Sequence, residues 1–265
     1  LTQQPLEEVF KLNYLVAYAL GSIAVFGAGL LLCLKLQRQP LNASAMQALG
    51  MSAANSGFVG YPVAAMVIGS PAAVLLALNM LVENLLVLPA ALILAEMGNH
   101  QGASVWKTVK QTALSLIKNP VLVGLLTGIF LAVSGVKIPA PLFKAIDMLA
   151  EAAGPAALFV IGGALFGLQV KGMASDVGQI VVGKLLIHPL VIFIAFYFVP
   201  DIDPLYMAGA LLFAASPMIS IYPLFGQRYG VGGMSAAAML VATISSFFTL
   251  SLIIWLMTLS GLLSF

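Results

Sequence analysis

Residues 53–62 read AANSGFVGYP and interrupt a long apolar run with two glycines and a proline. Residues 214–223 read AASPMISIYP and repeat the Ala-Ala and Tyr-Pro pairs at the same spacing. Glycine loosens a helix, and proline removes a backbone donor and clashes with the preceding turn. Four identities in ten positions are weak evidence in an alanine-rich chain, but both stretches lie in the middle of an apolar segment. The sequence therefore predicts two apolar helices that are interrupted at matching points.

The composition places the whole chain in a lipid bilayer. Of its 265 residues, 62% are hydrophobic and 8% are charged, whereas soluble domains carry about 25% charged residues. A soluble fold is excluded. Disordered and collagenous proteins are excluded because apolar residues dominate, and a disulfide-stapled protein is excluded because Cys33 is the single cysteine. The net charge of +2 is too small to indicate nucleic-acid binding. Because a bilayer leaves only helices and closed barrels fully hydrogen-bonded, we expect an all-α integral membrane protein.

Apolar runs bounded by charges, glycine or proline predict about eight transmembrane helices, since one span needs roughly 20 residues. Their approximate limits are 12–35, 43–69, 72–96, 119–136, 142–169, 177–199, 205–228 and 233–262. The polar stretch 98–118 is predicted to be a cytoplasmic amphipathic linker, because Trp106, Val109 and Leu114 lie among its lysines.

The positions of the basic residues support this count, because lysine and arginine concentrate in cytoplasmic loops. If the first span ends in the cytoplasm, seven basic residues fall inside: Lys35, Arg38, Lys107, Lys110, Lys118, Lys171 and Arg228. Three fall outside, namely Lys11, Lys137 and Lys144, and Lys184 lies within a span. This topology places both ends of the chain outside the cytoplasm, and the two interrupted spans run in opposite directions.

The two interrupted spans are the second and the seventh, which predicts an inverted repeat of five helices. The predicted division is 1–97 for a partial first repeat, 98–118 for the linker and 119–265 for the second repeat. Two helices are then missing before the first interrupted span. We expect an N-terminally truncated form of a ten-helix carrier, and the first residue, Leu1, agrees with this because it is not methionine.

Paired interrupted helices in inverted halves are typical of the binding site of a secondary transporter. The interruptions free backbone groups, and half-helix N-termini favour an anionic group such as a carboxylate. The candidate substrate-binding residues are Asn55, Ser56, Gly57, Gly60, Tyr61, Pro62, Ser216, Pro217, Ser220, Tyr222 and Pro223. The alternative is that glycine and proline only mark kinks or close packing between membrane helices.

Ionisable residues inside a span are costly and therefore indicate function. Glu83 lies near the middle of span 72–96, with Asn79 one turn earlier on the same face. Lys184 and His188 are four residues apart on span 177–199. We expect these four to contribute ion coupling or charge near the substrate. The alternatives are hydrogen bonds between helices and, for Lys184, a side chain that extends to the membrane surface.

The sequence contains no pattern typical of an enzyme or a metal protein. Two histidines in different regions and one cysteine do not make a zinc site. A Gly-x-Ser-x-Gly motif does not occur. The stretch GQIVVGK (178–184) has the spacing Gly-x-x-x-x-Gly-Lys, but Leu185 follows it where the phosphate-binding motif requires serine or threonine. We therefore expect no enzymatic activity, no cofactor and no direct use of ATP, so that an ion gradient or the membrane potential would drive transport.

Four motifs make the chain resemble the auxin efflux carrier family, in particular bacterial members described as malonate or other dicarboxylate permeases. They are NSGFVGYP (55–62), KNPVLVG (118–124), LFVIGG (158–163) and KLLIHP (184–189). The resemblance covers the whole chain. The resemblance implies ten helices in two inverted five-helix repeats, with the fourth and ninth helices crossing at broken points. It also implies a multi-pass carrier of organic anions, here expected in the bacterial inner membrane.

The resemblance further assigns 12–96 and 177–262 to the mobile transport part and 119–170 to the scaffold. The family's substrate-facing asparagine maps onto Asn55, whereas Ser216-Pro217 departs from the pattern in the second crossover. A cation-coupled carrier of the bile-acid symporter type remains an alternative, because Glu83, Asn79 and Asn84 are suited to Na⁺. A channel or an intramembrane enzyme is a further alternative. The substrate, the coupling ion (H⁺ or Na⁺), the direction of transport and a homodimeric state stay open.

Overall fold

The computed structural model describes residues 11–99, 138–149, 173–200 and 202–263, together with isolated residues between 110 and 152. Within this part, the regular structure is helical and no strand forms. Four of its helices are long and apolar enough to cross a membrane: Leu12–Leu36, Pro71–Asn99, Ala174–Phe198 and Gly232–Leu259. The predicted linker 98–118 and the predicted spans 119–136 and 142–169 lie largely outside the described residues.

The described helices follow the predicted apolar runs closely. They are α2 (Leu12–Leu31), α3 (Leu41–Ser52), α4 (Tyr61–Ile68), α5 (Pro71–Val82), α6 (Leu88–Asn99), α10 (Ala174–Val182), α11 (His188–Phe198), α12 (Pro204–Ala215), α13 (Tyr222–Arg228) and α14 (Gly232–Leu259). Short π-helical turns occupy Leu32–Leu36, Ser56–Gly60, Glu83–Val87 and Gly183–Ile187. The last two join α5 to α6 and α10 to α11, so that each pair forms one continuous span.

Three of the π-helical turns have a common cause in the sequence. Pro62, Pro89 and Pro189 each follow the last residue of such a turn by two positions. In an α-helix a proline ring collides with the carbonyl four residues earlier and leaves that carbonyl without a donor. A π-helical turn widens the backbone at this point and keeps the helix continuous. The prolines therefore reshape these spans without ending them, and Glu83 and Lys184 both lie within the reshaped turns.

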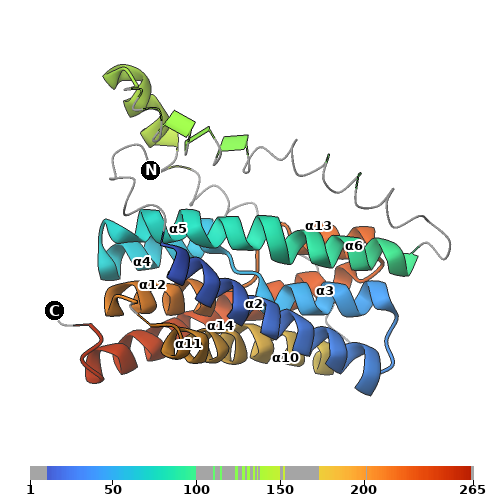
Figure 1. Cartoon of the computed structure of the whole chain (residues 1–265). Coiled ribbons are helices and arrows are strands. Elements are labelled where there is room, and N and C mark those ends of the chain that lie inside the picture. Colours follow the sequence, from blue (N-terminus) through green and yellow to red (C-terminus); the bar gives the residue numbers. More distant parts are fainter. Residues whose placement is uncertain are drawn as a thin grey trace.

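The two interrupted helices lie side by side in the middle of the described structure and run in opposite directions (Figure 1). At one end of the bundle α4 packs against α12, and at the other end α3 packs against α13. The long helix α5–α6 extends along both halves of the first interrupted helix, and α2 and α11 pack against each other nearby. The middle of the bundle is filled by buried apolar side chains of all these elements.

Close packing between the interrupted helices depends on two glycines. A Cβ atom added at Gly60 would lie 2.6 Å from Cδ1 of Phe213 on α12. One added at Gly50 of α3 would lie 2.7 Å from the ring of Tyr222 on α13. Small residues let membrane helices approach closely because they leave room for the neighbour's side chain. The interrupted helices thus interlock on both sides of their breaks.

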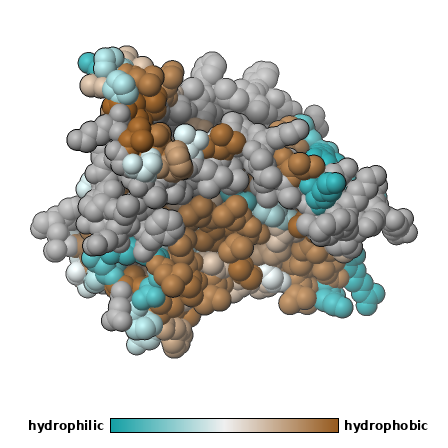
Figure 2. Space-filling model, turned by 45° about the horizontal axis from the view of Figure 1, so that its top comes forward, coloured by the Kyte–Doolittle hydropathy of each residue, from teal (hydrophilic) through white to brown (hydrophobic). Residues whose placement is uncertain are grey.

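Large apolar side chains cover much of the described surface (Figure 2). On α2, α11 and α14 the exposed ones include Leu12, Leu20, Leu31, Phe193, Tyr197, Phe198, Phe247, Phe248, Trp255 and Leu259. Arg228 lies at the end of the bundle where α6 finishes, because it pairs with Glu96, whereas Lys11 lies at the opposite end, over the ring of Tyr206. An apolar girdle between polar ends is the arrangement expected of helices that cross a bilayer.

Candidate functional site

The candidate site is built around two breaks, which we call the first break (residues 53–55) and the second break (residues 216–221). At the first, α3 ends at Ser52 and Ala53 adopts an extended conformation, with φ −97° and ψ 134°. At the second, α12 ends at Ala215 and Ser216 is likewise extended, with φ −69° and ψ 157°. Extended residues cannot continue the helical hydrogen bonds, so backbone groups on both sides of each break are released.

The two breaks meet, and we call their meeting point the crossing. Ala54 and Met218 form an isolated antiparallel bridge. The backbone N–H of Asn55 donates to the carbonyl of Pro217 over 2.7 Å. The two breaks therefore supply hydrogen-bond partners to some of each other's free backbone N–H and C=O groups. Inside a membrane, backbone groups need such partners because water is absent.

The predicted residues around the first break differ in exposure. Asn55 and Ser56 are buried, and the Asn55 Oδ1 atom accepts a hydrogen bond from the N–H of Phe58 over 3.3 Å. This bond caps the half-helix that begins at Ser56. Gly57 is partly exposed, and Gly60 is buried against Phe213. Tyr61 and Pro62 are exposed and lie outside the buried group, within the helix that follows the break.

Around the second break the backbone is more enclosed. Ser216 and Pro217 are buried, and the Ser216 hydroxyl donates to the carbonyl of Phe213 over 2.7 Å. Tyr222 is fully buried at the start of α13, whereas Ser220 and Pro223 are partly buried. Pro223 occupies the first turn of α13, where a proline favours the start of a helix because no backbone donor is required there.

Glu83 contacts the first break directly. Its Oε1 atom accepts hydrogen bonds from the Ala54 backbone N–H over 3.2 Å, from the Ser56 hydroxyl over 2.9 Å and from the Tyr18 hydroxyl over 3.2 Å. Glu83 as a whole is 5% exposed. Three donors converge on one oxygen, which is the arrangement that stabilises a carboxylate away from water.

Lys184 contacts the second broken helix in a corresponding way. Its ammonium donates to the carbonyl of Ala214, next to the last residue of α12, and to Nδ1 of His188 over 2.9 Å. The Nε2 atom of His188 lies 3.1 Å from the Ser22 hydroxyl. An ammonium can only donate, so Nδ1 is the acceptor and the Nε2–H is available to donate to Ser22. Lys184 and His188 are both fully buried.

Helix α2 connects these two clusters through residues that the sequence argument missed. The Tyr18 hydroxyl bonds Glu83, and the Tyr18 ring meets the His188 ring edge-on with centroids 6.1 Å apart. One turn earlier, the Tyr14 hydroxyl donates to Oδ1 of Asn79 over 2.9 Å. Tyr14, Tyr18 and Ser22 are four residues apart, so their spacing places three polar groups on one helical face and could have identified them.

Among the described residues, three buried side-chain polar atoms have no hydrogen-bond partner. They are Nδ2 of Asn79, one turn before Glu83, Oγ of Ser220 in the second break, and the hydroxyl of Tyr222 directly after it. Buried polar groups are normally paired, so an unpaired one calls for a ligand, a water molecule or a structural reason. An amide N–H and a hydroxyl are both able to donate to a carboxylate oxygen.

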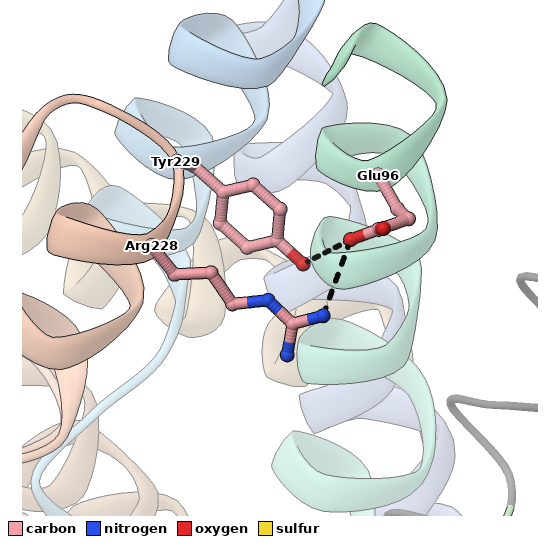
Figure 3. A network of polar contacts seen from close by, with 3 residues as sticks. All are labelled: Glu96, Arg228 and Tyr229. Carbon is pink, nitrogen blue, oxygen red and sulfur yellow. Dashed lines mark hydrogen bonds and ion pairs between the residues drawn. The ribbon is translucent and has the colours of Figure 1, made fainter. Parts of the chain in front are cut away.

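A second polar cluster lies at the end of the bundle, away from the crossing (Figure 3). Glu96 of α6 accepts from the Tyr229 hydroxyl over 3.0 Å and from Arg228 over 3.4 Å. Arg228 is the last residue of α13, and Tyr229 directly follows it. Burial raises the pKa of Tyr229 to about 12, so its hydroxyl stays protonated and donates at neutral pH. Asn42, at the start of α3, donates to Asn99 and to the Tyr229 carbonyl, which ties three elements together at this end.

The described residues do not form a group of three or more histidine, cysteine or acidic side chains that could hold a metal ion. The crossing offers hydrogen-bond donors, one buried carboxylate and one buried ammonium. Such a set can bind and orient a charged molecule.

Comparison with known proteins agrees with the membrane character of the fold. A family model described as "Membrane transport protein" matches residues 1–256. The chain is also 28% identical over 258 residues to a protein of Rhizobium meliloti (strain 1021) named "Putative malonate transporter", with 96% of this chain and 80% of the relative covered. The chain therefore belongs to the family of membrane transport proteins that comprises the auxin efflux carriers.

Proposed function

We propose that this transporter is a secondary active carrier that moves small organic anions, such as dicarboxylates, by alternating access at the crossing. The observation that carries the proposal is the meeting of the two breaks, where Asn55 N–H donates to the Pro217 carbonyl over 2.7 Å. Interrupted helices of this kind supply backbone and side-chain groups to a ligand within the membrane. The name of the Rhizobium meliloti relative supports a dicarboxylate such as malonate.

The substrate carboxylates bind beside the crossing, against donors that the protein does not use internally. Asn79 Nδ2 and Ser220 Oγ are buried without a partner. Asn55 uses Oδ1 to cap the following half-helix, and its Nδ2 is a further donor at the first break. Ser56, Gly57, Gly60, Ser216, Pro217 and Tyr222 shape the backbone around this position.

Two inverted five-helix repeats form the transport machinery. In the described part, Leu12–Leu36 corresponds to Ala174–Phe198, α3–α4 to α12–α13, and Pro71–Asn99 to α14. The opposite directions of the two broken helices support this pairing. Segments 12–96 and 177–262 move as the transport part against a scaffold that includes 119–170, with 98–118 as the cytoplasmic linker. The plasma membrane of a bacterium is the expected location.

Uptake of labelled malonate into proteoliposomes tests this function. Asn55→Ala removes the cap and a donor at the first break, and we expect uptake to fall by about tenfold or more, the loss expected for one hydrogen bond to a charged group. Ser246→Ala is the matched control, because Ser246 is buried and its hydroxyl bonds only to its own helix, at the Thr243 carbonyl.

The same liposomes separate a carrier from a channel. A carrier saturates, and unlabelled malonate on the opposite side of the membrane accelerates entry of the label, whereas a channel gives flux that is linear in driving force. Full activity of Asn55→Ala, or flux without saturation, would count against the proposed site or the proposed mechanism. Replacement of sodium by choline, and a separate pH series, would identify the coupling ion.

A further inference from the structure

Four helix ends lie at the crossing, and each carries a partial charge. A helix N-terminus exposes N–H groups and is partly positive, whereas a C-terminus exposes carbonyls and is partly negative. The half-helix that begins at Ser56 continues through α4 to Ile68, and α12 runs from Pro204 to Ala215. Both of these ends are buried inside the bundle, where water is not available to compensate them.

Glu83 lies at the positive end of the first of these half-helices. Its Oε1 atom accepts from Ala54 N–H and from the hydroxyl of Ser56, the first helical residue after the break. The carboxylate comes from α5–α6, a separate span that runs alongside. A negative charge at this position stabilises the start of the half-helix.

Lys184 lies at the negative end of the other half-helix. Its ammonium donates to the Ala214 carbonyl in the last turn of α12, and its side chain is fully buried. A positive charge stabilises a helix C-terminus for the converse reason. His188 and Ser22 hold the ammonium in place through the chain of hydrogen bonds described above.

The two charges act on different helices and are not in direct contact. No ion pair within 4.0 Å joins Glu83 to Lys184 in the described structure, where Arg228 and Glu96 do form one. Each charge instead makes its hydrogen bonds to a break or to the residues that support it. Each charge therefore has its direct contacts at a helix end and not at the other charge, although the two opposite charges still attract each other across the buried interior.

We propose that Glu83 and Lys184 are positioning residues, each compensating the end of one broken half-helix and so holding the two breaks in register for the substrate. This inference rests on the proposed function. Lys184 already donates to the Ala214 carbonyl, so compensation of the α12 carbonyls does not require a sodium ion. The substrate then meets a crossing whose internal charges are already balanced.

A substrate-free measurement tests the inference independently of transport. Thermal unfolding of the purified protein in detergent is compared for Glu83→Gln, Lys184→Met and the double variant, with Ser246→Ala as control. Glutamine keeps the acceptor oxygen and removes only the charge. We expect each single change to lower the midpoint by roughly 4–8 °C, the shift that loss of a buried charge at a helix end produces in a chain of this size. The double variant should be less stable than either single variant, with a loss below the sum of the two because the opposite charges also attract each other.

Two outcomes of the unfolding experiment would overturn the inference. If the double variant is more stable than either single variant, the two residues stabilise each other mainly as an ion pair and the inference is wrong. Where Lys184→Met yields no folded protein, its combination with Glu83→Gln still decides, because an ion pair predicts that folding is recovered. A saturable rise of the wild-type midpoint with sodium, and not with choline, would also overturn the inference.

Transport kinetics add a readout that a purely structural role would leave unchanged. In proteoliposomes, Glu83→Gln should raise the KM for malonate by about tenfold while Vmax per folded transporter stays close to wild type. An unchanged KM with a reduced Vmax would overturn the positioning role. If wild-type protein does not transport malonate at all, the proposed function fails while the unfolding experiment still stands.

Discussion

Gly50 allows the two broken helices to interlock, and its replacement by alanine is expected to destabilise the crossing. A Cβ atom at this position would lie 2.7 Å from both Cζ and the hydroxyl oxygen of Tyr222, and 2.9 Å from Cγ2 of Ile180. Both neighbours are completely buried. Neither side chain has open space into which it could withdraw, so the backbones of α3 and α13 must separate slightly.

The magnitude follows from two opposing terms. An extra methyl group in a packed interior costs about 1–3 kcal/mol, whereas alanine in place of glycine in a helix returns up to about 1 kcal/mol. Gly27 in the middle of α2 has no atom within 4 Å of its would-be Cβ, so Gly27→Ala keeps only the favourable term. The two variants should therefore differ by about 1–3 kcal/mol, with Gly50→Ala the less stable.

Thermal unfolding in detergent measures this difference. For a chain of this length, about 2–4 °C of midpoint corresponds to 1 kcal/mol. Tyr222→Phe removes the hydroxyl oxygen, one of the three close atoms, so Gly50→Ala combined with Tyr222→Phe should recover part of the loss. If Gly50→Ala is as stable as Gly27→Ala, the two broken helices do not pack as described.

Three further predictions concern the residues around the crossing and the ends of the bundle. Tyr18→Phe removes the 3.2 Å hydrogen bond to Glu83 and should cost about 1–3 kcal/mol of stability, measured by thermal unfolding; an unchanged midpoint would contradict the bond. Arg228→Gln should cost less than about 1 kcal/mol, an effect that salt abolishes, because Arg228 is 64% exposed in its pair with Glu96; a large, salt-independent loss would contradict this. Cys33 is fully buried, so maleimide labelling followed by mass spectrometry should be slow in the folded protein and rapid after unfolding in SDS, and rapid labelling before unfolding would show that its burial is wrong.

The amino-acid sequence determined where the described helices lie, because each span is selected by its own contact with lipid. Apolar runs of about 20 residues suffice for that selection. The predicted spans at 12–35, 72–96, 177–199 and 233–262 correspond to helices that are long and apolar enough to cross a membrane. The interruptions near residues 53–62 and 214–223 were also predicted correctly, although the breaks lie at 53–55 and 216–221.

The prolines inside spans illustrate what the pattern left undetermined. Pro62 and Pro223 were expected to break their helices, but both lie within helical segments that follow a break. Pro89 and Pro189 also follow π-helical turns. The sequence analysis did not predict these turns, because the apolar pattern continues through them without interruption. A proline in a span is compatible with a break, a kink or a π-helical turn, and the choice depends on the neighbouring helices.

The sequence by itself determined that a few polar residues must be buried in the membrane, since Asn79, Glu83, Lys184 and His188 lie inside apolar spans. Only the tertiary structure decided which helix end each of them meets. Ser22 and His188 are separated by 166 positions, and Glu83 and Ala54 by 29. Lipid exposure acts on each span separately, whereas these contacts arise when several helices pack together, and no local pattern encodes which side chains then touch.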